Sequence, residues 1–313
     1  MVTEDLKSNQ ENKTKVGFRN KRKYNDWMWA YIMIAPLMAG MIYFYFIAFF
    51  QNFFFSFTDL NAFGKWSFIG ITNYVKILKD PTVWQAFKNT AFFTIVSVPI
   101  SICLSIFVAY LLNSKIKGRT IYRTLFFLPV VTMPAAVAMV WRWLYIGDYG
   151  IINYFLKMLS IKGPYWLNDP RYAIFTVITV AIWSSIGYNM VIFLAGMQGI
   201  SSTYYEAAAI DGANSFAKFF KITLPLLTPT IFFVSIISLI RSFQVFDLIL
   251  MMITEQSVAL EQTQSIVYLF YKIAFVFGNR GYASAISIIL FFVILIVTIV
   301  QTKYQGKWVT YDV

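Results

Sequence analysis

The sequence predicts an all-α polytopic membrane protein, and two features of its composition carry that prediction. Of the 313 residues, 59% are hydrophobic and only 13% are charged. That is more apolar surface than a soluble domain of this size can bury. The apolar residues also form long continuous runs, whereas a membrane β-barrel would show alternating segments of roughly ten residues. A bundle of membrane-crossing helices is therefore expected.

Six apolar segments reach the length of about twenty residues that a spanning helix needs. We expect these six transmembrane helices at residues 27–50, 89–112, 122–145, 172–198, 224–252 and 282–302. Prolines within such helices kink them or leave backbone groups for neighbouring helices to satisfy. Four prolines lie inside the predicted spans: Pro36, Pro99, Pro129 and Pro134.

The placement of Lys and Arg predicts the orientation. Residues 1–26 are polar and basic, and the apolar segment that follows is too long for a signal peptide and lacks a typical cleavage site. Basic residues recur in the loops 113–121 and 199–223 and at the C-terminus, while the alternate loops mix both signs. By the positive-inside rule these segments and both termini are cytoplasmic. The predicted organisation is a basic tail over 1–26 and a membrane domain over 27–313.

Composition also limits the chemistry. The chain has no histidine and one cysteine, Cys103, which argues against His-ligated metal or haem sites and His general bases and rules out an intrachain disulfide. We attribute the net charge of +12 to the positive-inside bias and anionic lipid headgroups rather than to nucleic acid. No phosphate-binding loop of the Gly-x-x-x-x-Gly-Lys-Ser/Thr type occurs. We expect neither a catalytic nor a metal site in this chain.

The cytoplasmic segment at about 199–223 is the most distinctive part of the sequence. Residues 204–210 are Ala-rich and predict a short helix, which Ser202 or Thr203 could cap. Glu206 lies in its first turn, where the helix dipole favours an acid, and Gly212 would end it. A loop that only reverses the chain would not need this much defined structure.

A basic amphipathic turn is predicted next. Three phenylalanines would share one face, two lysines another, and a proline would start the next helix: Phe216, Phe219 and Phe220; Lys218 and Lys221; Pro225. By the residues alone two roles stay open, an amphipathic element lying on lipid headgroups or a docking surface for another protein.

A motif within this segment favours the docking surface through the family that it resembles. Glu206-Ala-Ala, Gly212 six residues later, and Leu224-Pro225 followed by Pro229 closely resemble the EAA loop of ATP-binding-cassette (ABC) importer permeases. The variant Ala-Ala-Ala-Ile-Asp-Gly-Ala is similar to the carbohydrate branch, which includes the membrane subunits of maltose and glycerol-phosphate transporters.

The resemblance covers most of the chain. Further matching positions are Trp66, Gly70, Asn73-Tyr74, Asp80-Pro81, Trp84, Asn89-Thr90, Trp141, Gly150, Asn153, Phe243-Gln244, Phe246-Asp247 and Gly281-Tyr282. One departure stands out: many members have Thr-Gly-Gly-Gly-Pro after the fifth helix, whereas this chain has Thr254-Glu-Gln-Ser-Val-Ala-Leu-Glu261. We expect that loop to be shaped differently.

The resemblance implies a type I ABC importer permease in a bacterial inner membrane, with no enzyme activity or cofactor of its own. The implied partners are a second homologous permease subunit, an ABC ATPase dimer that binds ATP and Mg, an extracytoplasmic solute-binding protein and a sugar or oligosaccharide. Residues 203–217 would seat in a cleft of the ATPase. The expected ATPase-coupling residues are Glu206, Ala207, Ala208, Asp211, Gly212, Phe216 and Phe219.

Polar residues inside the predicted spans are candidates for the substrate pathway. Charges within the bilayer cost roughly 2.5–3.5 kcal/mol on insertion scales and usually face the bundle interior. Arg241, Gln244 and Asp247 recur every third residue, close to one helical face, and Tyr188 and Asn189 lie in the fourth span. These side chains offer the donors, acceptors and aromatic faces that sugars need. Alternatively, Arg241 and Asp247 satisfy partners on neighbouring helices, or Asp247 anchors an outer gate.

Two other classes remain as alternatives. A membrane-embedded glycosyl or acyl transferase would need clustered carboxylates or His near one interface, but the acidic residues are scattered. A proton-coupled secondary transporter would need several buried carboxylates, and only Asp247 lies clearly within a predicted span.

Overall fold

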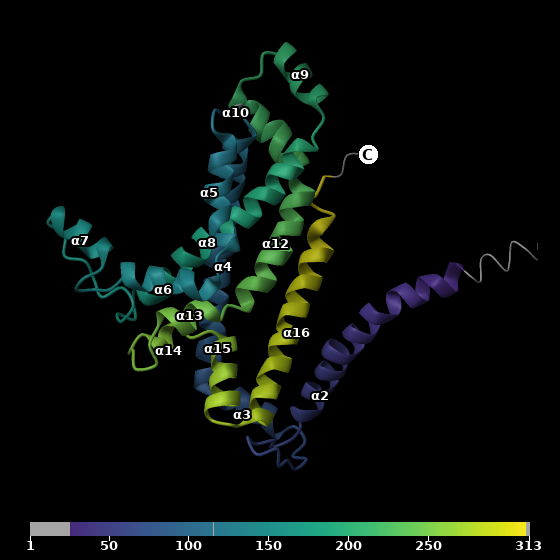
Figure 1. Ribbon diagram of the computed structural model, residues 1–313, viewed down its shortest axis with the longest axis vertical. Coiled ribbons are helices and arrows are strands. Elements are labelled where there is room, and N and C mark those ends of the chain that lie inside the picture. The colour runs from purple at the N-terminus through teal and green to yellow at the C-terminus, as the bar shows by residue number, and fades with distance from the viewer. Residues whose placement is uncertain (1–25, 115, 311–313) are drawn as a thin grey trace, which may run out of the picture. The chain divides into compact units, whose positions relative to one another are not determined.

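The computed structural model describes residues 26–114 and 116–310, whose regular secondary structure is helical apart from one isolated bridge between Thr58 and Phe68 (Figure 1). The all-α prediction is confirmed. The chain divides at Phe55 into two compact units. Of the predicted basic tail, only Asp26 lies among the described residues, and its cytoplasmic side stays a prediction.

The first unit contributes one long helix, Asp26–Phe55. It includes the π-helical stretch η1 (Ile42–Ile47) and α2 (Ala48–Phe55). Its 30 residues span about 45 Å at 1.5 Å per residue, which is enough to cross a bilayer. The helix continues through Pro36.

Three helices of the second unit are each long and apolar enough to cross a membrane without interruption. They are α4 (Pro81–Asn113), α8 (Ala173–Gln198) and α16 (Arg280–Gln305). α4 continues through Pro99, so the proline expected to kink this span does not end the helix. With the helix of the first unit, four unbroken candidate spans correspond to four of the six predicted.

The remaining two predicted spans are bent. α5 (Arg119–Val131) and α6 (Pro134–Leu144) meet at 100°, and the run Ser215–Leu226 meets α12 (Thr228–Phe243) at 64°. Counting each pair as one span gives six by length and composition. The first bend falls just before Pro134, which takes the first helical position because its ring has no N–H to donate.

The predicted fifth span, 224–252, is not one continuous helix. α12 ends at Phe243, and α13 (Asp247–Met252) begins after a non-helical break. The carbonyl of Val245 in this break accepts a hydrogen bond from Ser265 Oγ at 2.6 Å. Irregular backbone is tolerated in a membrane protein where other parts of the protein satisfy it.

α8 packs along α4, α5 and α12. Its approach to α5 requires glycine, because a Cβ on Gly187 would lie 2.0 Å from the carbonyl oxygen of Phe126. Buried apolar side chains of α4, α8 and α12, among them Ile106, Phe193 and Val234, form one of the core clusters. Packing therefore fixes α4, α8 and α12 relative to one another.

Short helices complete the second unit: α3 (Thr72–Lys79), α7 (Ile151–Met158), α14 (Leu260–Thr263), α15 (Ile266–Tyr271) and the π-helical η3 (Lys272–Val276). The divergent 254–261 segment leads into α14 and is tied to α4. Asn89 Nδ2 donates to the carbonyls of Glu261 and Gln264 at 2.9 and 3.1 Å.

Candidate functional site

Two regions hold most of the sequence-predicted residues, and the first is the segment around α9 (Ser202–Ile210). The cap of α9 differs from the prediction. Ser201 is the N-cap, and its hydroxyl accepts from the backbone N–H of Thr203 at 3.3 Å. Ser202 lies inside the first turn because the helix begins two residues earlier than the Ala-rich pattern indicated.

The end of α9 agrees with the prediction. The helix stops at Ile210, and Gly212 takes φ +76°, a left-handed conformation that costs glycine little. The N–H of Ala213 then donates back to the carbonyl of Ala208 at 2.8 Å. This bond satisfies a carbonyl that the helix end would otherwise leave unpaired.

α10 (Ser215–Lys218) begins at Asn214, whose side chain accepts from Ala217 N–H at 2.8 Å. It runs through the π-helical η2 (Phe219–Thr223) into α11 (Leu224–Leu226). Pro225 lies at the start of α11, as expected, but the bend comes after it. The long helix α12 begins with Thr228, and Pro229 lies in its first turn.

Contacts within this segment and with Tyr110 of α4 hold it in place. Tyr205 on α9 hydrogen-bonds to Thr223 at 3.0 Å between their oxygens. The ring of Phe219 packs edge-on against Tyr110 of α4, with centroids 4.7 Å apart. Phe219 therefore packs within the chain and is half-buried.

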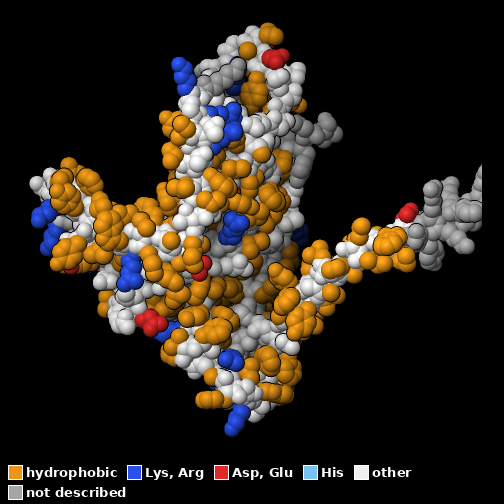
Figure 2. Space-filling model, viewed as in Figure 1, with side chains coloured by type: hydrophobic (Ala, Val, Ile, Leu, Met, Phe, Trp, Pro, Cys, Tyr) orange, Lys and Arg blue, Asp and Glu red, His pale blue; other side chains and the backbone are white. Residues whose placement is uncertain are grey.

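The other predicted coupling residues face outward. Glu206, Ala207, Asp211 and Gly212 are exposed, Ala208 is half-buried, and Phe216 is 72% exposed. Among the described residues Glu206 has no hydrogen-bond or ion-pair partner. Figure 2 shows acidic and hydrophobic side chains on the surface of the end that carries α9. The segment thus presents an unpaired carboxylate beside exposed apolar side chains.

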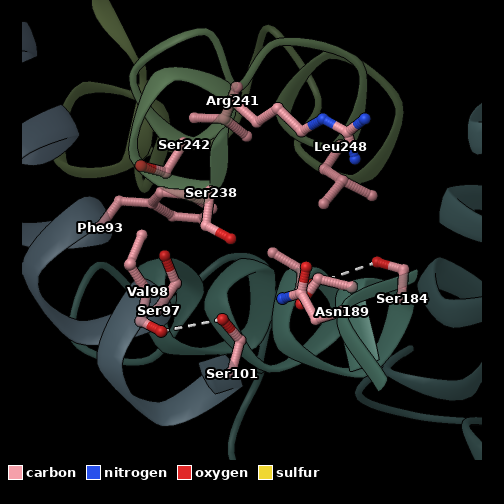
Figure 3. Close-up of a pocket in the computed structure, with 13 residues that line it drawn as sticks. Phe93, Ser97, Val98, Ser101, Ser184, Asn189, Ser238, Arg241, Ser242 and Leu248 are labelled. Atoms are coloured by element: carbon pink, nitrogen blue, oxygen red, sulfur yellow. Dashed lines mark hydrogen bonds between the residues drawn. The ribbon is translucent and has the colours of Figure 1, made fainter. Parts of the chain in front are cut away.

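The second region is a cavity of about 240 Å³ between α4, α8 and α12 (Figure 3). Its lining combines one charged side chain with hydroxyl, amide and apolar groups: Phe93, Ser97, Val98, Ser101, Ala181, Ser184, Ser185, Asn189, Ser238, Arg241, Ser242, Val245 and Leu248. A polar interior between otherwise apolar helices is what a polar solute would need in order to pass.

Arg241 is the charged residue of this lining. Its guanidinium carbon lies 4.3 Å from the ring centroid of Tyr188, within range of a cation–π interaction. The one ion pair among the described residues joins Arg171 to Asp169, so no carboxylate of the described chain pairs with Arg241. The predicted residues Tyr188 and Arg241 are thus brought together.

Asn189 also lines the cavity. The residue is only 3% exposed, yet its amide nitrogen has no hydrogen-bond partner in the described chain. Figure 3 shows its side chain directed toward the space between the helices. A buried donor without an acceptor costs about 1–3 kcal/mol, so a bound solute or water is its natural partner.

Gln244 and Asp247 occupy different positions from those predicted. Gln244 ends α12 and Asp247 starts α13, so the intervening break removes them from the helical face of Arg241. Both are exposed, and neither lines the cavity. The pattern of every third residue assumed a continuous helix, which the break at Val245 interrupts.

Sequence reasoning missed the six serines of the lining: Ser97, Ser101, Ser184, Ser185, Ser238 and Ser242. At least three donate to carbonyls of their own helix, as Ser184 does to Val180 at 2.7 Å. Their oxygen lone pairs stay available to accept from another hydroxyl. The signal that could have found them is serine at i, i+4 on two spans and adjacent serines on a third.

Known proteins resemble nearly the whole chain. Residues 82–309 match the family described as "Binding-protein-dependent transport system inner membrane component". The "Probable ABC transporter permease protein YesP" of Bacillus subtilis (strain 168) is 35% identical over 297 residues, covering 94% of this chain and 95% of that protein. The trehalose/maltose transport system permease protein MalF of Thermococcus litoralis is 31% identical over 286 residues, covering 91% and 96%.

A solved structure has the same fold. A bacterial alginate ABC transporter, crystallised with an alginate pentasaccharide-bound periplasmic protein, contains a chain that aligns with a TM-score of 0.83 at 22% identity, covering 94% of this chain and 99% of that one. At this identity the likeness concerns the fold alone. It confirms the type I importer permease fold that the EAA-like spacing led us to expect.

Proposed function

Since the chain belongs to the family of binding-protein-dependent transport system inner membrane components, we propose that it carries a sugar or oligosaccharide across the membrane. It acts as one permease subunit of an ABC importer, and its relatives are permeases rather than enzymes. The observation that carries the proposal is the polar cavity between α4, α8 and α12. A saccharide suits it, because serine oxygens can accept from sugar hydroxyls and Asn189 can donate to them.

The α9 segment is the proposed docking site for the ATPase that binds ATP and Mg. Its exposed apolar side chains, Phe216 and Ile210, need a protein surface to cover them. The unpaired carboxylate of Glu206 would meet a basic group of that ATPase, and the small side chains of Ala207 and Gly212 allow close approach. The alternative of a lipid-surface role remains suited to Lys221, which is exposed on η2.

The contacts of this segment give a route from the docking site to the cavity. Phe219 packs on Tyr110 of α4, and α4 carries Ser97 and Ser101. The run from α10 to α11 leads through one bend into α12, which carries Arg241. Movement of the docked segment would therefore shift two of the three cavity walls, as alternating access between packed helices requires.

The cavity of this chain is smaller than the roughly 300–1,000 Å³ of typical ligand pockets. We propose that a second homologous permease subunit completes it. An ATPase dimer and an extracytoplasmic solute-binding protein would complete the importer, and a bacterial inner membrane would hold it. Most of the apolar side chains that α5 and α16 expose, such as Leu125 and Ile296, would then face lipid or this second subunit.

Reconstitution of the complete importer in lipid vesicles tests the proposal. We expect uptake of a saccharide only with the binding protein outside and ATP at the ATPase, and inhibition by vanadate. Uptake that needs a proton gradient but no ATP would contradict it and favour a secondary transporter. Transfer of a glycosyl or acyl group by the purified chain would favour the transferase alternative.

A further inference from the structure

We propose that the transported saccharide is anionic and that Arg241 binds its carboxylate or phosphate group inside the cavity. The inference rests on the proposed function and specifies its substrate class. It begins from charge: Arg241 is the charged residue of the lining, and no acidic side chain stands opposite it there. Arg241 lies in the last turn of α12 with an exposed side chain, and no carboxylate of the described chain neutralises it, so an anionic ligand can supply the opposite charge.

The donors of Arg241 are free for a ligand. The guanidinium lies over Tyr188, and this contact with the ring face uses no N–H group. Among the described residues, Arg241 donates no hydrogen bond and forms no ion pair. The planar fork of five donors fits a carboxylate or phosphate through two parallel bonds.

A second free donor lies in the same lining. The amide nitrogen of Asn189 is buried without an acceptor, so it can donate to the same anion or to a neighbouring sugar oxygen. The serine oxygens around it accept from sugar hydroxyls. The cavity thus offers free donors for an anionic group and acceptors for hydroxyl groups. This combination suits an acidic or phosphorylated sugar better than a neutral one.

The competing explanation is that a carboxylate of the second permease subunit neutralises Arg241. In that case Arg241 would hold the two subunits together, and its loss would affect every substrate alike. The two explanations therefore differ in whether the effect of a substitution depends on the charge of the saccharide.

The first experiment uses the solute-binding protein that stimulates the ATPase of the purified importer. The thermal stabilisation of this binding protein is measured with galacturonate oligosaccharides, neutral galactose oligosaccharides of equal length, and sugar phosphates. We expect stabilisation by the uronates or the phosphates, and the two arms tell which group is recognised. Stabilisation by neutral saccharides alone would overturn the inference and leave the proposed function intact. Stabilisation by no saccharide would overturn both.

The second experiment measures ATP-dependent uptake by the reconstituted importer. Arg241→Gln should lower uptake of the anionic saccharide about tenfold or more, the loss of one charge-assisted pair, while Arg241→Lys should retain an intermediate rate. Asn189→Asp should also lower it, since a carboxylate there repels the ligand. Arg171→Gln, the same change at an exposed residue outside the cavity, should change nothing.

Assembly of each variant is checked by co-purification of the subunits, and Arg241→Lys keeps the charge if Arg241→Gln fails to assemble. The inference is overturned if Arg241→Gln lowers uptake of neutral and anionic saccharides by the same factor, or if Asn189→Asp leaves uptake of the anionic saccharide unchanged.

Discussion

The α9 segment and the cavity are built in opposite ways. The α9 segment is continuous in sequence and exposed. Few contacts hold it to the rest of the second unit, such as Phe219 with Tyr110. The cavity is assembled from three helices that are far apart in sequence, and each wall is fixed by packing of whole helices.

This difference predicts how each region responds to change. A substitution on the exposed face of α9 should alter function and leave stability unchanged, because little of the fold depends on it. A substitution in the helices that frame the cavity should alter both, because packing and function share the same side chains.

Charge reversal at Glu206 should have the largest effect on uptake. Glu206→Lys would place a like charge against the basic group of the ATPase, which costs several kcal/mol. We expect ATP-dependent uptake to fall about 10- to 100-fold, measured in vesicles, while the thermal midpoint of the purified importer stays unchanged. Lys157→Glu, a charge reversal on α7, is the control. Normal uptake by Glu206→Lys would refute the docking role.

Gly187 tests the packing that holds α8, one wall of the cavity, against α5. In Gly187→Ala the new Cβ would overlap the carbonyl oxygen of Phe126 on α5, and backbone cannot move aside as a side chain can. We expect a loss of about 1–3 kcal/mol in stability, seen as a lower thermal midpoint, together with reduced uptake. Gly306→Ala is the matched control because a Cβ there meets nothing within 4 Å. Equal midpoints would contradict the described packing of α5 on α8.

Gly212 tests whether the turn after α9 matters for coupling. Its φ of +76° is costly for a residue with a Cβ, about 1–2 kcal/mol. Gly212→Val should therefore distort the turn and lower uptake several-fold, while Gly212→Asn, which tolerates this conformation better, should lower it less. The global thermal midpoint should stay unchanged for both. Equal uptake by the two variants would show that the backbone conformation is not what the segment needs.

The smallest expected effect concerns one hydrogen bond between cavity walls. Ser242 Oγ on α12 donates to Thr94 Oγ1 on α4 at 3.0 Å, and a bond of this kind contributes about 0.5–1.5 kcal/mol. Ser242→Ala and Thr94→Val should each lower the thermal midpoint slightly, and the double variant should lower it by less than the sum. Strict additivity would indicate that the two hydroxyls act independently.

Features set by nearby residues could be predicted from the sequence, and features set by distant residues could not. The helix end at Gly212 was predicted, because turn chemistry acts over a few residues. The prediction of one continuous helix over 224–252 was wrong. The break at Val245 is stabilised by a hydrogen bond from Ser265, twenty residues away in the sequence. The prediction that Arg241 and Asp247 share one helical face was wrong because of the same break.

The sequence by itself determined that this chain is a bundle of about six membrane helices with an ABC-permease motif between two of them. Long apolar runs and a motif of fixed spacing are local properties, so they survive without knowledge of the fold. Only the tertiary structure decided that Ser97, Ser184 and Ser238 meet Arg241 around one cavity, and that Phe219 packs inward while Phe216 stays exposed. Such neighbours depend on which helix faces pack together, and one sequence does not contain the register of that packing.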